Sequence, residues 1–218
     1  MDDVLFVLEQ LKKKADAACL KGMARFGIDN SRALGVKLPE IRKLAKIIKK
    51  DHELALALWD TQIHEARLLA SMIADPKQVT PELMDSWTGD FYSWDICDQV
   101  CGNLFDRTPF AIDKAVEYSS HEQEFVKRAG FVLMAEYAVH NKTAPDEIFT
   151  NLFPIMEREA WDDRNYVKKA INWALRQIGK RNNILKVKAI NTAQNIYGQP
   201  SKSAKWIAKN ALHELISK

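Results

Sequence analysis

One pattern occurs three times in this sequence, as EFVKRAGFVLMAEY (124–137), NYVKKAINWALRQI (165–178) and WIAKNALHEL (206–215). The copies begin at residues 124, 165 and 206, so that each is offset from the last by 41 residues. The positions that coincide are Lys127, Lys168 and Lys209, and Ala129, Ala170 and Ala211. HEARLLASMIAD (64–75) is a looser copy. Such self-similarity predicts stacked helical units that share one core.

The composition predicts the same class of fold. Only 8 glycines and 7 prolines interrupt 218 residues, which is too few turn residues for a protein rich in strands. A period of 41 residues falls within the range of about 40–47 for HEAT-like units, whereas other helical repeats lie near 33–34. We therefore expect an all-α fold, a right-handed α-solenoid of HEAT-like two-helix repeats with a concave basic groove. It would form a single HEAT-like-repeat domain over residues 1–218, with about a dozen helices in pairs.

Several classes of function are disfavoured. No apolar run approaches the roughly 20 residues that a membrane-spanning helix requires. Cys19, Cys97 and Cys101 have no disulfide spacing, and the first residues lack a secretion signal, so a cytoplasmic location is expected. Cys97 and Cys101 are one helical turn apart, but with no histidine or third cysteine nearby we expect small core residues rather than a metal site. We predict no metal and no cofactor.

The net charge of +3 averages over opposite segments. From Glu82 to Glu124 there are ten acids and two bases, whereas from Arg164 to Lys209 there are eleven bases and no acid. Residues 37–50 add six bases against one acid. Two basic regions could flank the path of a polyanion, although a solvated helix face is an equally simple interpretation.

Helical geometry favours the first interpretation for residues 165–180. An apolar stripe is formed by Val167, Ala170, Ile171, Ala174, Leu175 and Ile178. Roughly opposite lie Tyr166, Lys169, Trp173, Arg176 and Lys180. A large aromatic side chain among cations is typical of nucleic-acid binding surfaces, so we expect Trp173 to be exposed. The alternative is that a neighbouring helix covers it.

Arg128 occupies the position of Lys169 in the 41-residue register, so we expect both to show the same face. Arg128 would bind either a phosphate or a carboxylate, the second as a structural ion pair.

Residues 90–105, DFYSWDICDQVCGNLF, predict a helix with an apolar stripe of Trp94, Cys97, Cys101 and Leu104. Asp98 lies at its edge, one turn after Trp94. A carboxylate at such an edge is costly unless it is paired or used. Asp98 would either form a structural ion pair with Arg128 or, beside the indole, stabilise a positive charge that develops during a reaction.

These positions resemble the AlkD-type DNA alkylation repair family of HEAT-like-repeat DNA glycosylases. The resemblance rests on SWDICDQVCGNLF, EFVKRAGFVLMAEY, NYVKKAINWALRQIGKRN and GMARFGIDNSRALGVKLPEIRKLAK, and spans nearly the whole chain. It implies that Asp98 is the catalytic carboxylate, that Trp94 and Trp173 contact the lesion nucleotide, and that Arg128 clamps the backbone beside the site. It also implies that the damaged base is not flipped into a pocket.

The leading hypothesis is therefore a monofunctional glycosylase that releases N3-methyladenine and N7-methylguanine from duplex DNA, acting as a monomer. Asp98 would stabilise the oxocarbenium character of the sugar. The residues expected to bind DNA are Tyr166, Lys168, Lys169, Arg176, Lys180, Arg181, Lys127 and Lys205. The rival hypothesis is a HEAT-like module that binds DNA or a protein without catalysis.

Overall fold

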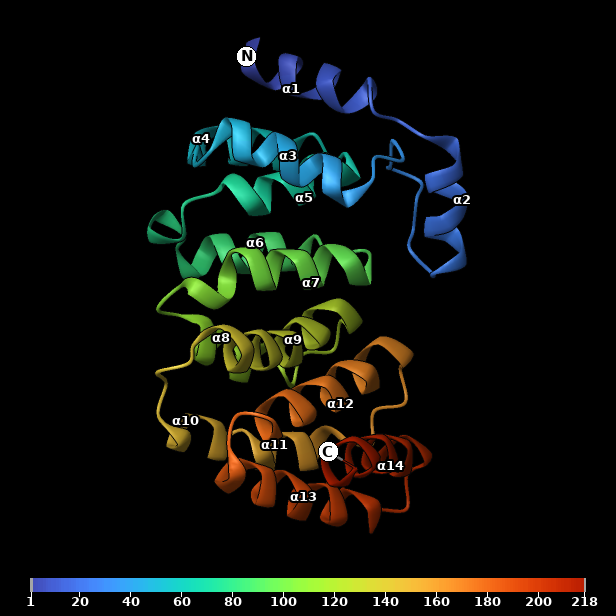
Figure 1. Ribbon diagram of the computed structural model, residues 1–218, viewed down its shortest axis with the longest axis vertical. Coiled ribbons are helices and arrows are strands. Elements are labelled where there is room, and N and C mark those ends of the chain that lie inside the picture. Colours follow the sequence, from blue (N-terminus) through green and yellow to red (C-terminus); the bar gives the residue numbers. More distant parts are fainter. Residues whose placement is uncertain (1, 218) are drawn as a thin grey trace. The chain divides into compact units, whose positions relative to one another are not determined.

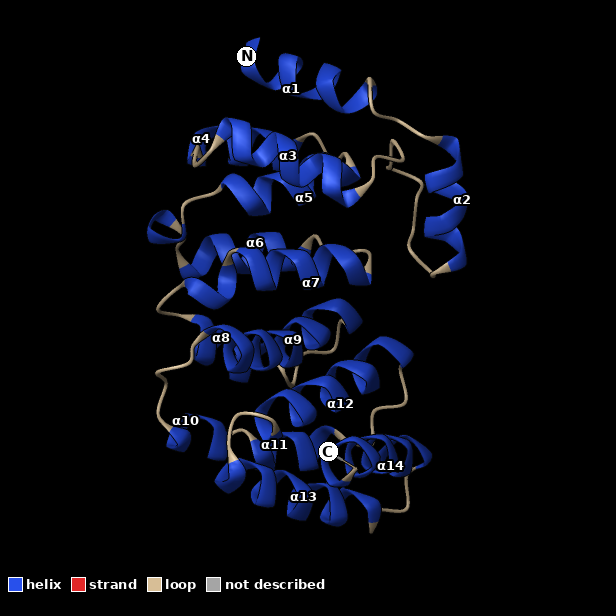
Figure 2. Cartoon of the chain, viewed as in Figure 1, coloured by secondary structure: helices blue, strands red, loops and turns tan. Residues whose placement is uncertain are grey.

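The computed structural model describes residues 2–217, and every regular element in that range is helical (Figure 1, Figure 2). Fourteen α-helices and two short 3₁₀ helices occur in the described range, against the dozen expected. The prediction of an all-α fold is confirmed. No helix among the described residues has the length and apolar character needed to cross a membrane.

The chain forms two compact units. Unit 1 comprises Met1–Met84 and Phe91–Thr108, and unit 2 comprises Asp85–Asp90 and Pro109–Lys218. The single domain, the right-handed superhelix and its concave groove stay predictions.

Unit 1 is built around helix α5 (His64–Ile73), which packs against α3 (Leu38–Ile48), α4 (His52–Asp60) and α7 (Trp94–Asn103). The other elements are α1 (Asp2–Lys12), α2 (Ala17–Arg25), η1 (Pro76–Gln78) and η2 (Phe105–Arg107), and α6 (Pro81–Gly89) begins here and ends in unit 2. All the residues of α5 except Met72 are buried, which explains why the looser copy of the repeat is so apolar. By contrast, α2 has no buried residue.

A buried carboxylate joins α5 to the loop before α3. Glu65 accepts hydrogen bonds from the backbone N–H groups of Leu34, Gly35 and Val36, at 2.8, 2.7 and 3.0 Å. The loop conformation requires glycine, because Gly35 has φ = 85° and a Cβ there would lie 2.5 Å from the carbonyl oxygen of Asp16. These contacts fix the loop that leads from α2 into the body of unit 1.

Unit 2 contains the three clear copies of the repeat as α9 (Glu124–His140), α12 (Asn165–Gly179) and α14 (Lys202–Ile216). Helix α12 packs between α9 and α14, so the copies are neighbours in space as well as in sequence. The coincident alanines, Ala129, Ala170 and Ala211, are all fully buried. The remaining helices are α8 (Ala111–Tyr118), α10 (Asp146–Thr150), α11 (Phe153–Glu159) and α13 (Asn183–Tyr197). The 41-residue period therefore marks the core of this unit.

Candidate nucleic-acid interface

In unit 1, helix α7 presents Trp94 and Asp98 on consecutive turns. Its inner face is formed by Cys97, Cys101 and Leu104, all fully buried. Trp94 and Asp98 lie at the margin of this face and are both half-buried. Three of the four residues of the predicted stripe are thus buried, whereas Trp94 lies at its edge, so an indole and a carboxyl group lie one turn apart at the surface of this helix.

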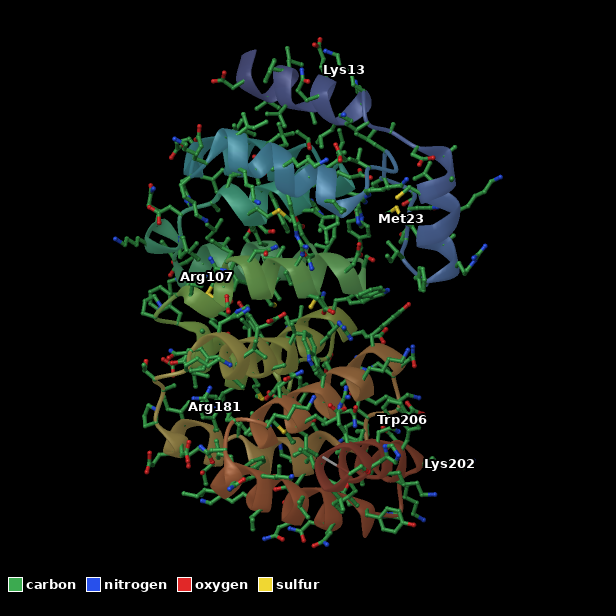
Figure 3. The ribbon with its side chains drawn as sticks, in the orientation of Figure 1. Lys13, Met23, Arg107, Arg181, Lys202 and Trp206 are labelled. Carbon is green, nitrogen blue, oxygen red and sulfur yellow. The ribbon has the colours of Figure 1, made fainter. Side chains whose placement is uncertain are left out.

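The indole of Trp94 is held by the segment that follows α2. Its Nε1–H donates to the carbonyl oxygen of Phe26 at 3.1 Å. Trp94 also lines a largely apolar cavity of about 250 Å³, together with Met23 and Cys19 of α2 and Leu68 of α5. Figure 3 labels Met23 on α2. Although α2 has no buried residue, this hydrogen bond and the shared cavity wall link α2 and the residue after it to α7.

A hydrogen-bonded network fixes the start of α7. His64 Nε2 lies 2.8 Å from Asp95 Oδ2, and His64 Nδ1 lies 3.0 Å from the hydroxyl of Tyr92. Ser93 donates to the other oxygen of Asp95 at 2.5 Å. Burial alone would raise the pKa of Asp95, but hydrogen bonds from His64 and Ser93 outweigh it and lower that pKa. The network joins α5 to the first turn of α7, which carries Trp94.

Sequence reasoning missed this network. The signals for it were a histidine at the start of the 64–75 segment and an acid directly after Trp94. Nothing in the spacing of 31 residues joins the two, because the contact forms only when α5 packs on α7.

In unit 2, helix α12 has the predicted amphipathic arrangement. All six residues of the predicted apolar stripe are fully buried. On the other face Lys169 is exposed, whereas Tyr166 and Trp173 are half-buried. Phe125 of α9 packs against the ring of Tyr166, with centroids 5.4 Å apart. Trp173 is therefore outside the core, as expected, but is not fully exposed.

Two of the cations on this face are paired. Arg176 and Lys180 both form ion pairs with Glu214 of α14. Hydrogen bonding to Lys180, and then to Arg176, lowers the pKa of Glu214 to about 2. Glu214 lies just beyond the acid-free segment, so counting charges along the sequence overstated the unpaired positive charge.

Arg128 does not show the same face as Lys169. Its side chain is only 6% exposed, and Nη1 donates to the carbonyl oxygen of Tyr166 at 2.6 Å. The equivalence with Lys169 was wrong because α12 covers this side of α9. Arg128 therefore joins neighbouring copies of the repeat.

Lys127, predicted to bind DNA, is also in the interior. It is 3% exposed and pairs with Glu159 at 2.7 Å and Asp162 at 2.9 Å. Burial tends to raise the pKa of Asp162, but hydrogen bonds from Arg164 and Lys127 lower it to about 2. The side chain cannot reach a phosphate without leaving two buried carboxylates, so the expectation for Lys127 is corrected to a structural one.

Arg181 is corrected in the same way. Its guanidinium donates to the carbonyl oxygens of Ala138, Asn141, Lys142 and Ala144 and lies 4.0 Å from the ring centroid of Phe149. Figure 3 labels this residue. These bonds use the planar fork of donors that would otherwise bind a phosphate.

The predicted residues are thus divided between the units. Trp94 and Asp98 belong to unit 1, whereas Arg128, Trp173 and the α12 face belong to unit 2. Lys168 is half-buried with its ammonium 5.7 Å from the ring centroid of Trp206, and Lys205 is exposed. Among the described residues, no cluster of histidine, cysteine and acidic side chains could hold a metal ion.

Comparisons with known proteins bear on the family and the fold. No curated protein matches the sequence at a significant level. A solved structure from a family related to the HEAT-like repeat DNA glycosylases, with affinity for branched DNA structures, superposes with a TM-score of 0.77 at 20% identity. The match covers 96% of this chain and 94% of the other, and it shows the HEAT-like repeat fold. The sequence model described as DNA alkylation repair enzyme matches residues 7–215. This chain therefore belongs to the DNA alkylation repair enzyme family.

Proposed function

We propose that this protein is a monofunctional DNA glycosylase that hydrolyses the N-glycosidic bond of cationic alkylated purines, N3-methyladenine and N7-methylguanine, in duplex DNA. The observation that carries the proposal is the pairing of Trp94 and Asp98 on consecutive turns of α7, where both keep part of their surface open. Membership of the DNA alkylation repair enzyme family supports the same reaction class.

The chemistry requires little from the protein besides electrostatics. An N3- or N7-alkylated purine is a cation, so it takes the electron pair of the C1′–N bond and departs as a neutral base without a general acid. The positive charge then develops on the deoxyribose, as in other glycoside hydrolyses. In the proposal, anionic Asp98 stabilises that charge and the indole of Trp94 faces it with its negative quadrupole. A water molecule forms the new C1′–O bond and loses a proton to Asp98 or to solvent.

Fewer residues are proposed to contact DNA than the sequence suggested. Trp173, Lys169 and Tyr166 on α12 would approach the strand, with Lys168 and Lys205 nearby. Arg176 and Lys180 would share their charge with Glu214. Consistent with a base that is not flipped, the proposal needs no pocket for it. The protein would act as a monomer in the cytoplasm and without a cofactor.

A second function is DNA binding without base release. Two observations favour it: Arg128 is buried against the carbonyl of Tyr166, and the structural neighbour is described by its affinity for branched DNA. Under this alternative Asp98 is a structural carboxylate.

A base-release assay separates the two functions. Methylated duplex DNA is incubated with the wild-type protein and with Asp98→Asn, which preserves shape and removes the charge. Free 3-methyladenine and 7-methylguanine are quantified by chromatography. Release by the wild type alone supports the glycosylase. Tight, salt-sensitive duplex binding without release above the Asp98→Asn control supports the binding module and overturns the glycosylase.

A further inference from the structure

Helix α14 carries a cationic stripe that its packing does not explain. Lys202, Lys205, Trp206 and Lys209 follow the spacing i, i+3, i+4, i+7, which places them on one face of the helix. The three lysines are exposed, and Trp206 is 36% exposed. The opposite face supplies the core residues Ala204, Ile207, Ala208, Ala211 and Leu215. We call the four outward residues the α14 stripe; Figure 3 labels Lys202 and Trp206.

The charge of the α14 stripe is not neutralised by neighbouring acids. Among the described residues 2–217, no carboxylate forms an ion pair with its lysines. The nearest acid along the helix is Glu214, which is already bound by Arg176 and Lys180 of α12. Lys168 of α12 adds a further cation beside the ring of Trp206. The N-terminal half of α14 therefore offers positive charge around an accessible indole.

We propose that the α14 stripe binds a single-stranded segment of DNA, with Trp206 stacking on a base and the lysines contacting phosphates on either side. An indole face gains most from an unstacked base, and lysines at intervals of one helical turn can follow a flexible backbone. A blunt duplex hides its base faces and would meet only the lysines. This inference rests on the DNA-binding part of the proposed function and adds a preference for strands that are open beside the duplex.

Fluorescence anisotropy with two labelled probes tests the proposal. One is an oligothymidylate of roughly 12 nucleotides, within the site sizes of single-strand binders, and the other is a blunt duplex of the same length. We expect Trp206→Ala to weaken oligothymidylate binding by roughly 5- to 100-fold and duplex binding by less than about twofold. Trp206→Phe should restore most of the affinity. Lys205→Gln with Lys209→Gln should lower the salt slope by about 0.7 for each phosphate that the lysines no longer neutralise.

Two controls keep the result specific. Phe6→Ala removes an exposed aromatic ring from α1, and Lys142→Gln removes an exposed cation outside the α14 stripe. Neither should change oligothymidylate binding. Thermal melting of each variant shows whether the fold is intact, and Trp206→Leu, which keeps an apolar side chain without a stacking ring, carries the test if Trp206→Ala unfolds.

The proposal is overturned if the wild type binds oligothymidylate no better than Trp206→Ala does, or if Trp206→Ala weakens both probes equally. Base release from blunt methylated duplex is measured separately. If the protein shows no preference for oligothymidylate but still releases methylated bases, only this inference is refuted. If it neither binds DNA nor releases bases, the proposed function is refuted as well.

Discussion

Replacing Lys127 by methionine tests the interior of unit 2 most sharply. The substitution keeps an unbranched side chain close to the length of the lysine stem and removes the ammonium that pairs with Glu159 and Asp162. Breaking a buried ion pair by removing one partner costs about 3–5 kcal/mol, and Arg158 and Arg164, which also bind these two carboxylates, offset only part of that cost. The ammonium of Lys127 also lies 5.0 Å from the ring centroid of Trp161, and the substitution removes this interaction as well.

The lowered pKa of Asp162 gives a second, independent estimate of how much this cluster stabilises the fold. This pKa is about 2 in the folded chain, against an ordinary value of 3.8. The difference corresponds to a contribution of about 2 kcal/mol to the free energy of unfolding at neutral pH. Because the folded-state pKa is depressed, this stabilisation is complete above about pH 4 and is lost as the pH falls towards 2. Arg164 supplies part of it, so Lys127→Met should reduce the acid dependence of unfolding without abolishing it.

Urea unfolding followed by circular dichroism measures the effect. We expect Lys127→Met to lower the free energy of unfolding by about 3–5 kcal/mol, and the exposed control Lys205→Met to change it by less than about 0.5 kcal/mol. Adding Glu159→Gln and Asp162→Asn to Lys127→Met should recover part of the loss, because the buried negative charges are then gone and Arg158 and Arg164, which lose these partners, are partly exposed to solvent. A loss below about 1 kcal/mol, together with weakened DNA binding, would refute the structural role and return Lys127 to the DNA interface.

Three further substitutions have distinct expected outcomes. Glu65→Ala leaves the N–H groups of the 34–36 loop without their acceptor, so urea unfolding should show a loss of about 3–5 kcal/mol, with Glu65→Gln less affected. Arg181→Ala should lower the melting temperature and leave the Kd for duplex DNA unchanged, since its donors bind backbone carbonyls; an altered Kd in a stably folded variant would contradict this. Trp173→Ala should cost about 1–2 kcal/mol in urea unfolding, less than a core tryptophan, and raise the Kd for duplex DNA roughly tenfold; unchanged binding would remove Trp173 from the interface.

The repeat period and the helical stripes made much of the fold predictable. The spacing of 41 residues identified α9, α12 and α14 as equivalent helices, and the buried alanines of each copy confirm that register. The position of Asp98 at the edge of the α7 stripe also followed from helical geometry alone. Periodicity succeeds here because burial within a helix depends on angle, which the sequence records directly.

Ion pairs between helices were harder to predict from the sequence than burial within one helix. Lys127, Lys168 and Lys209 share one register position, yet they are buried, half-buried and exposed in that order. Their environments differ because Lys127 meets carboxylates from the end of α11 and the loop after it, which the repeat does not encode. A charge count along the chain likewise missed that Glu214 pairs with Arg176 of α12 and with Lys180 directly after it.

The rate of base release under single-turnover conditions tests the proposed glycosylase most directly. The substrate is a duplex with one 7-methylguanine, incubated with excess wild-type protein, with Asp98→Asn and with Trp94→Phe. We expect measurable release by the wild type, a rate at least about 100-fold lower for Asp98→Asn, and a smaller loss for Trp94→Phe, all with similar duplex affinity. Equal rates for the wild type and Asp98→Asn, at or near the rate without protein, would show that Asp98 of α7 is not a catalytic carboxylate.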